Sequence, residues 1–147
     1  MTITDFLSEN CIIEELKGRD LKSVIDEMAI VLSKEINGII KPEEISRAIL
    51  SKEKELKEEA LGGVLIPHVR FDRVSIGVKG ALGRSKNGID GVYIVVMIIG
   101  DNESADRFVR ALSLISNFFR DKKNYNSVLK AESKKEIFEI MREKGME

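Results

Sequence analysis

The sequence predicts an α/β fold in which a mixed β-sheet is flanked by helices, within a single domain spanning residues 1–147. Helical periodicity occupies the first and last thirds of the chain, and strand-like runs occupy the middle. The order is helices, strands, helices rather than a strict alternation, which favours a mixed sheet over a purely parallel one. No repeat and no Pro/Gly/Ser-rich linker divides the 147 residues, a length that is sufficient to bury a substantial core.

Two amphipathic helices are predicted in the first third. From Asp20 to Leu32 the apolar residues recur at spacings of three and four, which places them on one helical face. Pro42 suits the first turn of a second helix, and Glu43 and Glu44 suit the positive end of its dipole. This second pattern fades in the charged run that begins at Lys52.

Strand signals follow. Val64–Ile66 is a short apolar run that stops at Pro67, and Val74–Val78 alternates apolar with small or polar residues. Asn87-Gly88 predicts a turn. The run Val92–Ile99 is apolar and mostly β-branched, which is typical of a strand covered on both faces.

The last third predicts helices again. One apolar stripe at helical spacing comprises Phe108, Ala111, Leu112, Ile115 and Phe119. Ser133, with Glu136 three residues later, predicts a capping box at the start of a closing helix.

Composition narrows the classes of function. The 24 basic and 25 acidic residues nearly cancel, which gives no support for binding to nucleic acid or to a membrane surface. The longest apolar run, Val92–Ile99, is far shorter than the roughly 20 residues of a membrane helix. A single cysteine, Cys11, cannot form an internal disulfide, so we expect a cytoplasmic protein. One histidine and one cysteine, far apart, offer no metal-binding spacing, and we expect neither a metal nor a cofactor.

The candidate for chemistry is His68, the only histidine of the chain. It directly follows a short apolar strand and Pro67, so we expect it at the rim of a sheet, where ligands of open α/β folds bind. Arg70 lies two residues on and offers a planar fork of donors for phosphate oxygens. Residues 70–86 hold five basic residues against one acidic residue, an excess that favours an anionic ligand or an acidic partner. A lone histidine is also common as a structural residue, and a basic excess is also common on a solvated strand, so the residues alone leave both readings open.

The segment Gly63-Val64-Leu65-Ile66-Pro67-His68-Val69-Arg70 resembles a family signature. It is similar to G-[IV]-x-[IV]-P-H-x-R, which surrounds the phosphorylated histidine of the fructose/mannitol-type enzyme IIA domains of the bacterial sugar phosphotransferase system. That family includes the nitrogen-related regulatory IIA proteins. The similarity extends over roughly residues 3–141, with supporting matches at Ile12–Leu16, Phe118–Asp121 and Lys134–Ile137.

The resemblance implies a mannitol-type IIA fold and a phosphocarrier function. His68 would accept a phosphoryl group from the phosphocarrier HPr, or from its nitrogen-branch equivalent. It would pass the group to a IIB domain or serve as a phosphorylation-dependent regulator, with Arg70 and Lys52 stabilising the phosphoryl oxygens. Neutral imidazole is nucleophilic at cellular pH, and nearby cations stabilise the charge in transfer. Sugar transport and regulation both stay open, as does the oligomeric state.

Two positions depart from the family pattern. Lys52 stands where the family usually has an arginine near the end of the helix before the motif, so the charge is kept but the bidentate fork is lost. Phe108 stands where typical members carry a second histidine, thirteen residues before Asp121. Because Phe108 belongs to an apolar stripe, packing in the core is its expected role. The departures leave a rival open: a regulatory protein-interaction module that kept the fold without efficient phosphotransfer.

Overall fold

The computed structural model describes residues 1–52, 54–56 and 62–146, and these residues form a mixed five-stranded sheet between helical layers. The strand order is β1-β4-β5-β2, and β3 also pairs with β5. The strands are β1 (Leu7–Ile13), β2 (Val64–Leu65), β3 (His68–Phe71), β4 (Val78–Ile89) and β5 (Val92–Asp101). Only β4 and β5 are antiparallel; β1, β2 and β3 run parallel to their neighbours. The α/β fold with a mixed sheet is therefore confirmed.

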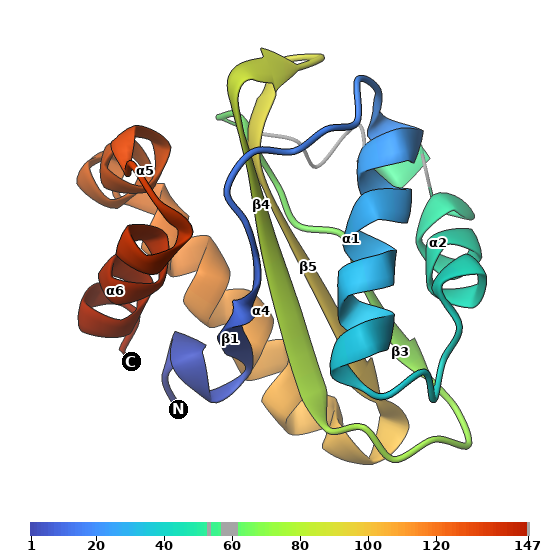
Figure 1. Cartoon of the computed structure of the whole chain (residues 1–147). Coiled ribbons are helices and arrows are strands. Elements are labelled where there is room, and N and C mark those ends of the chain that lie inside the picture. Colours follow the sequence, from blue (N-terminus) through green and yellow to red (C-terminus); the bar gives the residue numbers. More distant parts are fainter. Residues whose placement is uncertain (53, 57–61, 147) are drawn as a thin grey trace.

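Helices cover both faces of this sheet (Figure 1). The helices α1 (Leu21–Glu35) and α2 (Pro42–Leu50) lie on one face, and α4 (Ala105–Arg120) crosses the other. The helices α5 (Lys122–Lys130) and α6 (Lys134–Lys144) follow α4, and α6 contacts β1. Short 3-10 turns, η1 (Ile3–Asp5) and η2 (Asn102–Ser104), precede β1 and α4.

The strand β5 separates two apolar cores, as its composition predicts. Its odd and even positions alternate between the faces, because side chains of a strand point alternately to either side. Ile94, Val96 and Ile98 join the cluster under α4, and Val95, Met97 and Ile99 join the cluster under α1 and α2. A strand in this position needs apolar residues at every site, which explains its unbroken apolar run.

The predicted helix starts are confirmed. Asp20 caps α1 by accepting a hydrogen bond from the Ser23 backbone N–H, and Pro42 is the first residue of α2. Ser133 caps α6 by accepting from the Glu136 N–H. The Glu136 carboxylate accepts a hydrogen bond from the backbone N–H of Glu132, whereas a capping box would have it accept from the N–H of Ser133. The second hydrogen bond of the predicted capping box is therefore shifted by one residue.

The predicted turn at Asn87-Gly88 is wrong. These residues lie within β4, where the pairing with β5 shifts register between Arg84 and Ile89. The reversal is made by Asp90 and Gly91, whose φ angles of 51° and 82° suit the two-residue turn that matches strand twist. Asn-Gly and Asp-Gly are both strong turn formers. Here Asp90-Gly91 makes the turn, and Asn87-Gly88 lies where the hydrogen-bond ladder between β4 and β5 is interrupted.

The predicted strand Val74–Val78 forms only at its last residue, Val78. The carboxylate of Asp101 accepts hydrogen bonds from the Ile76 and Gly77 N–H groups at 2.8 and 2.7 Å, so a side chain takes the place of a neighbouring strand. Burial by itself raises the pKa of Asp101, but these bonds and those from Ser104 outweigh it, and the pKa lies below its ordinary value. Asp101 therefore fixes the loop between β3 and β4 as an anion.

Candidate functional site

His68 is the first residue of β3, a strand that pairs with β5 alone. Its Cα partner on β5 is Ile98, and the Ile98 N–H donates to the Pro67 carbonyl at 2.9 Å. The chain thus leaves β2, passes through buried Pro67 and re-enters the sheet at His68. The His68 side chain is half-buried. His68 thus directly follows the end of β2, as the sequence indicates, but it begins the next strand, β3, and is paired within the sheet rather than lying beyond its rim.

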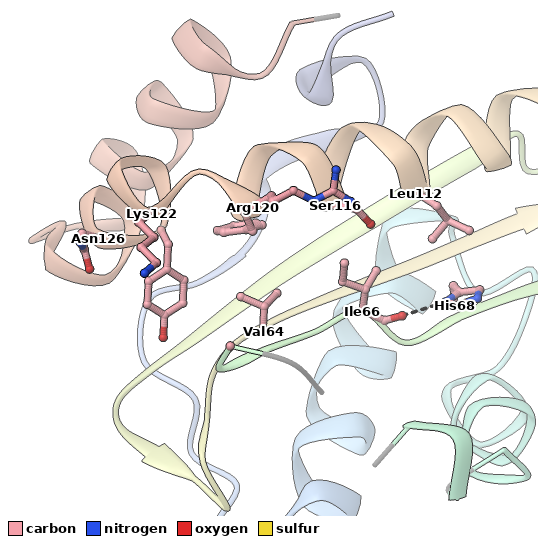
Figure 2. Close-up of a pocket in the computed structure, with 11 residues that line it drawn as sticks. Val64, Ile66, His68, Leu112, Ser116, Arg120, Lys122 and Asn126 are labelled. Atoms are coloured by element: carbon pink, nitrogen blue, oxygen red, sulfur yellow. Dashed lines mark hydrogen bonds between the residues drawn. The ribbon is translucent and has the colours of Figure 1, made fainter. Parts of the chain in front are cut away.

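The ring orientation of His68 is fixed by its own backbone. Nδ1 lies 2.8 Å from the Ile66 carbonyl oxygen, and the dashed line in Figure 2 marks this contact. A carbonyl oxygen only accepts, so Nδ1 must carry the hydrogen of this bond. In the neutral ring Nε2 then holds the free electron pair, which makes Nε2 the nucleophilic atom.

Arg70 lies on the same face of β3 as His68, because residues two apart on a strand point the same way. Both side chains lie beside Phe108 of α4. The Phe108 ring centroid is 6.1 Å from that of His68 and 6.0 Å from the Arg70 guanidinium carbon. Phe108 itself is only 5% exposed and belongs to the apolar core. Phe108, thirteen residues before Asp121, therefore belongs to the apolar core and also lies beside His68.

Lys52 approaches His68 from the opposite helical layer. Just after α2, Lys52 lines a small cavity of about 30 Å³ together with Ile49, Glu55, Leu56 and His68. The Lys52 side chain is exposed. The structure thus places Lys52, from the segment after α2, at a cavity that His68 also lines, and it places Arg70 beside Phe108, the ring that also lies beside His68.

The basic excess of residues 70–86 does not form one face. Arg84 is 1% exposed and serves the core: its guanidinium donates to the backbone carbonyls of Glu14, Val128 and Ala131. These bonds join β1, β4 and the end of α5, so Arg84 is structural. The prediction that all five cations favour an anion is wrong for Arg84, since a count of charges contains no information on burial.

A larger cavity, of about 780 Å³, extends from His68 along α4 (Figure 2). Val64 and Ile66 line one wall, and Leu112 and Phe119 of α4 line the other. Figure 2 shows His68 at one end and Lys122 and Asn126 at the other. The remaining lining residues are Gly62, Ser116, Arg120 and Tyr125.

The polar end of this cavity was missed by the reasoning from sequence. Arg120, Lys122 and Tyr125 lie more than fifty residues after His68, and α5, which carries two of them, was not predicted. The i, i+4 spacing of Leu112, Ser116 and Arg120 on one helix was the available signal, because such residues share a face.

The fold agrees with the comparisons with known proteins. Residues 5–144 match the model of the family described as phosphoenolpyruvate-dependent sugar phosphotransferase system, EIIA 2. The chain belongs to this family. The comparison with curated proteins found no significant match.

Solved structures of the same fold include regulatory and mannitol-specific proteins. The nitrogen regulatory protein IIA-Ntr from Neisseria meningitidis has a TM-score of 0.81 and 20% identity, covering 95% of this chain and 98% of that one. The cryptic mannitol-specific enzyme IIA CmtB from Escherichia coli gives 0.71 and 20%, covering 97% and 99%. The complex of the mannitol enzyme IIA with phosphorylated enzyme IIB from Escherichia coli gives 0.71 and 16%, covering 92% and 98%.

Within residues 1–52, 54–56 and 62–146, no three His, Cys, Asp or Glu side chains converge as a metal site would require. No helix in the described part of the chain is long and apolar enough to cross a membrane.

Proposed function

We propose that His68 accepts a phosphoryl group on Nε2 from a phosphorylated HPr-like protein and passes it to a IIB domain or uses it to signal to a regulatory target. The observation that carries this proposal is the hydrogen bond from Nδ1 to the Ile66 carbonyl, which leaves Nε2 as the atom with the free electron pair. Membership of the EIIA 2 family supports it, as does the complex of a related enzyme IIA with phosphorylated enzyme IIB. These partners would place the protein in the cytoplasm.

In the proposed step, the Nε2 electron pair of His68 attacks phosphorus while the phosphorus–nitrogen bond of the donor breaks and the donor takes back its electron pair. The Ile66 carbonyl holds the Nδ1–H throughout and favours the positive charge that the ring gains as Nε2 becomes bonded. The return step gives the phosphoryl group to the acceptor and restores the neutral ring. No hydrolysis and no cofactor are needed.

Arg70 and Lys52 would stabilise the phosphoryl oxygens from two sides. Residues two apart on a strand are about 7 Å apart, so the long Arg70 side chain can reach a group on His68. Lys52 lines the small cavity next to the ring and supplies a point charge rather than a fork. Charge developing on transferring oxygens is stabilised by such preorganised cations.

The rival function is a regulatory interaction module that does not carry phosphate efficiently. The observation that favours it is Phe108, an apolar ring 6.1 Å from the His68 ring, at the position where the resemblance to the family implies a second histidine. A site with one imidazole offers fewer partners to a phosphoryl group.

Phosphorylation with purified donors decides between the two functions. Incubated with phosphoenolpyruvate, enzyme I and HPr, or with their nitrogen-branch counterparts from the same organism, the protein should gain one acid-labile, base-stable phosphate. His68→Ala should abolish this label, and Arg70→Gln should slow labelling by roughly a hundredfold, the typical effect of losing one preorganised donor.

The matched control is Arg110→Gln, which removes an exposed arginine from α4 outside the residues that surround His68. It should label at the rate of the unchanged protein. Absence of labelling with all cognate donors would favour the interaction module instead.

A further inference from the structure

The large cavity beside His68 has the composition of a small-molecule site. Its volume of about 780 Å³ lies within the usual range for ligand pockets, roughly 300–1,000 Å³. Such pockets combine an apolar lining with a few polar groups that fix orientation. Here the apolar part is supplied by β2, the segment after it and α4, and the polar groups gather near the start of α5.

Among the residues that the structure describes, the charged side chains along the cavity have one sign. Arg120 and Lys122 are both exposed and both line it, and none of the described lining residues is acidic. Arg120 donates to the Asn117 side chain, a neutral acceptor, at 3.1 Å, so its charge is not cancelled by this partner. Tyr125 and Asn126 add a hydroxyl and an amide at the same end. An anionic group is therefore the complement of this end.

The apolar part of the cavity is elongated along α4. Leu112, Ser116 and Arg120 lie one above the other on α4, and eight helical residues rise about 12 Å. Figure 2 shows this row running from the His68 end towards Lys122. An elongated apolar body can therefore lie over Val64, Ile66 and Phe119, with its far end against His68.

We infer that this cavity binds an amphipathic small molecule with a single anionic head group. The head group is held by Arg120 and Lys122, and the apolar tail covers the approach to His68. This binding does not depend on phosphotransfer by His68, so it can be tested without any donor protein.

The test is a calorimetric titration of the whole protein with decanoate, below the concentration at which it forms micelles, combined with amide chemical-shift mapping. We expect saturable binding at one site, with shifts confined to β2, α4 and α5. Lys122→Gln and Arg120→Gln should each weaken binding by about tenfold, the effect of losing one charge-assisted hydrogen bond. Decyl phosphate in place of decanoate distinguishes a phosphate from a carboxylate head group, and either result is compatible with the inference.

Two controls make the inference falsifiable. Lys123→Gln removes the neighbouring exposed lysine, which does not line the cavity, and should bind decanoate like the unchanged protein. Decanol, which lacks the charge, should bind at least tenfold more weakly. Equal binding of decanol and decanoate, equal loss in the Lys122 and Lys123 variants, or shifts that spread over the molecule without saturation would each overturn the inference.

A second readout uses the fact that His68 is the only histidine. Diethyl pyrocarbonate modifies accessible imidazole, so the rate of histidine modification reports on His68 alone. Saturating decanoate should slow this modification severalfold. In Ser116→Phe, which fills the middle of the cavity, decanoate should give no protection. Unchanged modification of the unsubstituted protein at saturating decanoate would show that the ligand does not lie against His68.

Discussion

Replacing Phe108 with histidine tests whether an apolar ring limits the phosphoryl site. Phe108 is 5% exposed, so the substitution removes part of a buried apolar side chain and buries a polar one. An unpaired buried polar group costs about 1–3 kcal/mol, and the lost apolar surface adds about 1 kcal/mol. The Arg70 guanidinium, 6.0 Å from the Phe108 ring, can donate to one ring nitrogen and recover part of this cost. We expect Phe108→His to lower the free energy of unfolding by about 2–3 kcal/mol, or roughly 4–12 °C in Tm.

The functional gain should accompany this loss. A second imidazole beside His68 can donate to phosphoryl oxygens; one preorganised donor is worth about a hundredfold in rate, so a partial restoration should give about tenfold or more. The assay is the lifetime of the phosphorylated protein and the single-turnover rate of its formation, measured below the reduced Tm. The double variant His68→Ala, Phe108→His must stay unlabelled, which shows that the label remains on His68.

The matched control for this experiment is Phe118→His, on the same helix and 4% exposed. Phe118 packs edge to face against Phe119, with ring centroids 4.8 Å apart, near the opposite end of α4 from Phe108. It should lose similar stability with no gain in phosphorylation. If Phe108→His is folded and yet its phosphohistidine is no longer-lived than that of Phe118→His, the idea that Phe108 weakens the site is refuted.

Two buried charges give predictions on stability. Arg84→Met leaves the carbonyls of Val128 and Ala131 without their donor and should cost about 2–5 kcal/mol by urea denaturation, against less than about 0.5 kcal/mol for the exposed Arg110→Met. Asp101→Asn should cost about 1–3 kcal/mol at pH 7, because Asp101 accepts from backbone N–H groups as an anion. Since the folded pKa of Asp101 is lowered, its contribution is complete above the unfolded value of about 3.9 and is lost as pH falls through the folded pKa. The stability gap between Asp101→Asn and the unchanged protein should therefore narrow below pH 4, and a constant gap from pH 7 to acid would contradict this.

The parts of the fold that the sequence predicts are those where a periodic pattern coincides with burial. The strand β5 and the helices α1, α2, α4 and α6 were all indicated by unbroken or periodic apolar residues. The strand β1 and the helix α5 were missed. In β1 the middle residues Ser8, Glu9 and Asn10 are polar, and α5 reads KKNYNSVLK, in which only Asn124 and Val128 are buried. These elements depend on contacts with distant segments, and no local pattern reveals such contacts.

The distribution of charge along the sequence was the least reliable guide to the site. The excess of cations after His68 favoured an anionic ligand or an acidic partner, but burial assigns Arg84 to the core and leaves Arg70 exposed beside Phe108. Meanwhile Arg120 and Lys122, which line the cavity next to His68, lie outside the stretch that drew attention. A linear count of charges cannot separate these cases, because the position of a cation relative to the site is set by how α4 and α5 lie on the sheet.

At the site around His68, some features are set by neighbouring residues in the sequence and others by tertiary contacts. The bond from Nδ1 to the Ile66 carbonyl joins residues two apart across Pro67, so three consecutive residues suffice to select the nucleophilic nitrogen. By contrast, Lys52 lines a cavity beside the ring only because α2 lies beside the strand that carries His68, and Phe108 lies beside the ring only because α4 crosses the opposite face. The proposed nucleophile is thus encoded in a short motif, whereas the side chains proposed to affect its phosphoryl group are brought to it by tertiary packing. It follows that substitutions at Lys52 or Phe108 can change phosphoryl lifetime while the motif that selects Nε2 stays intact.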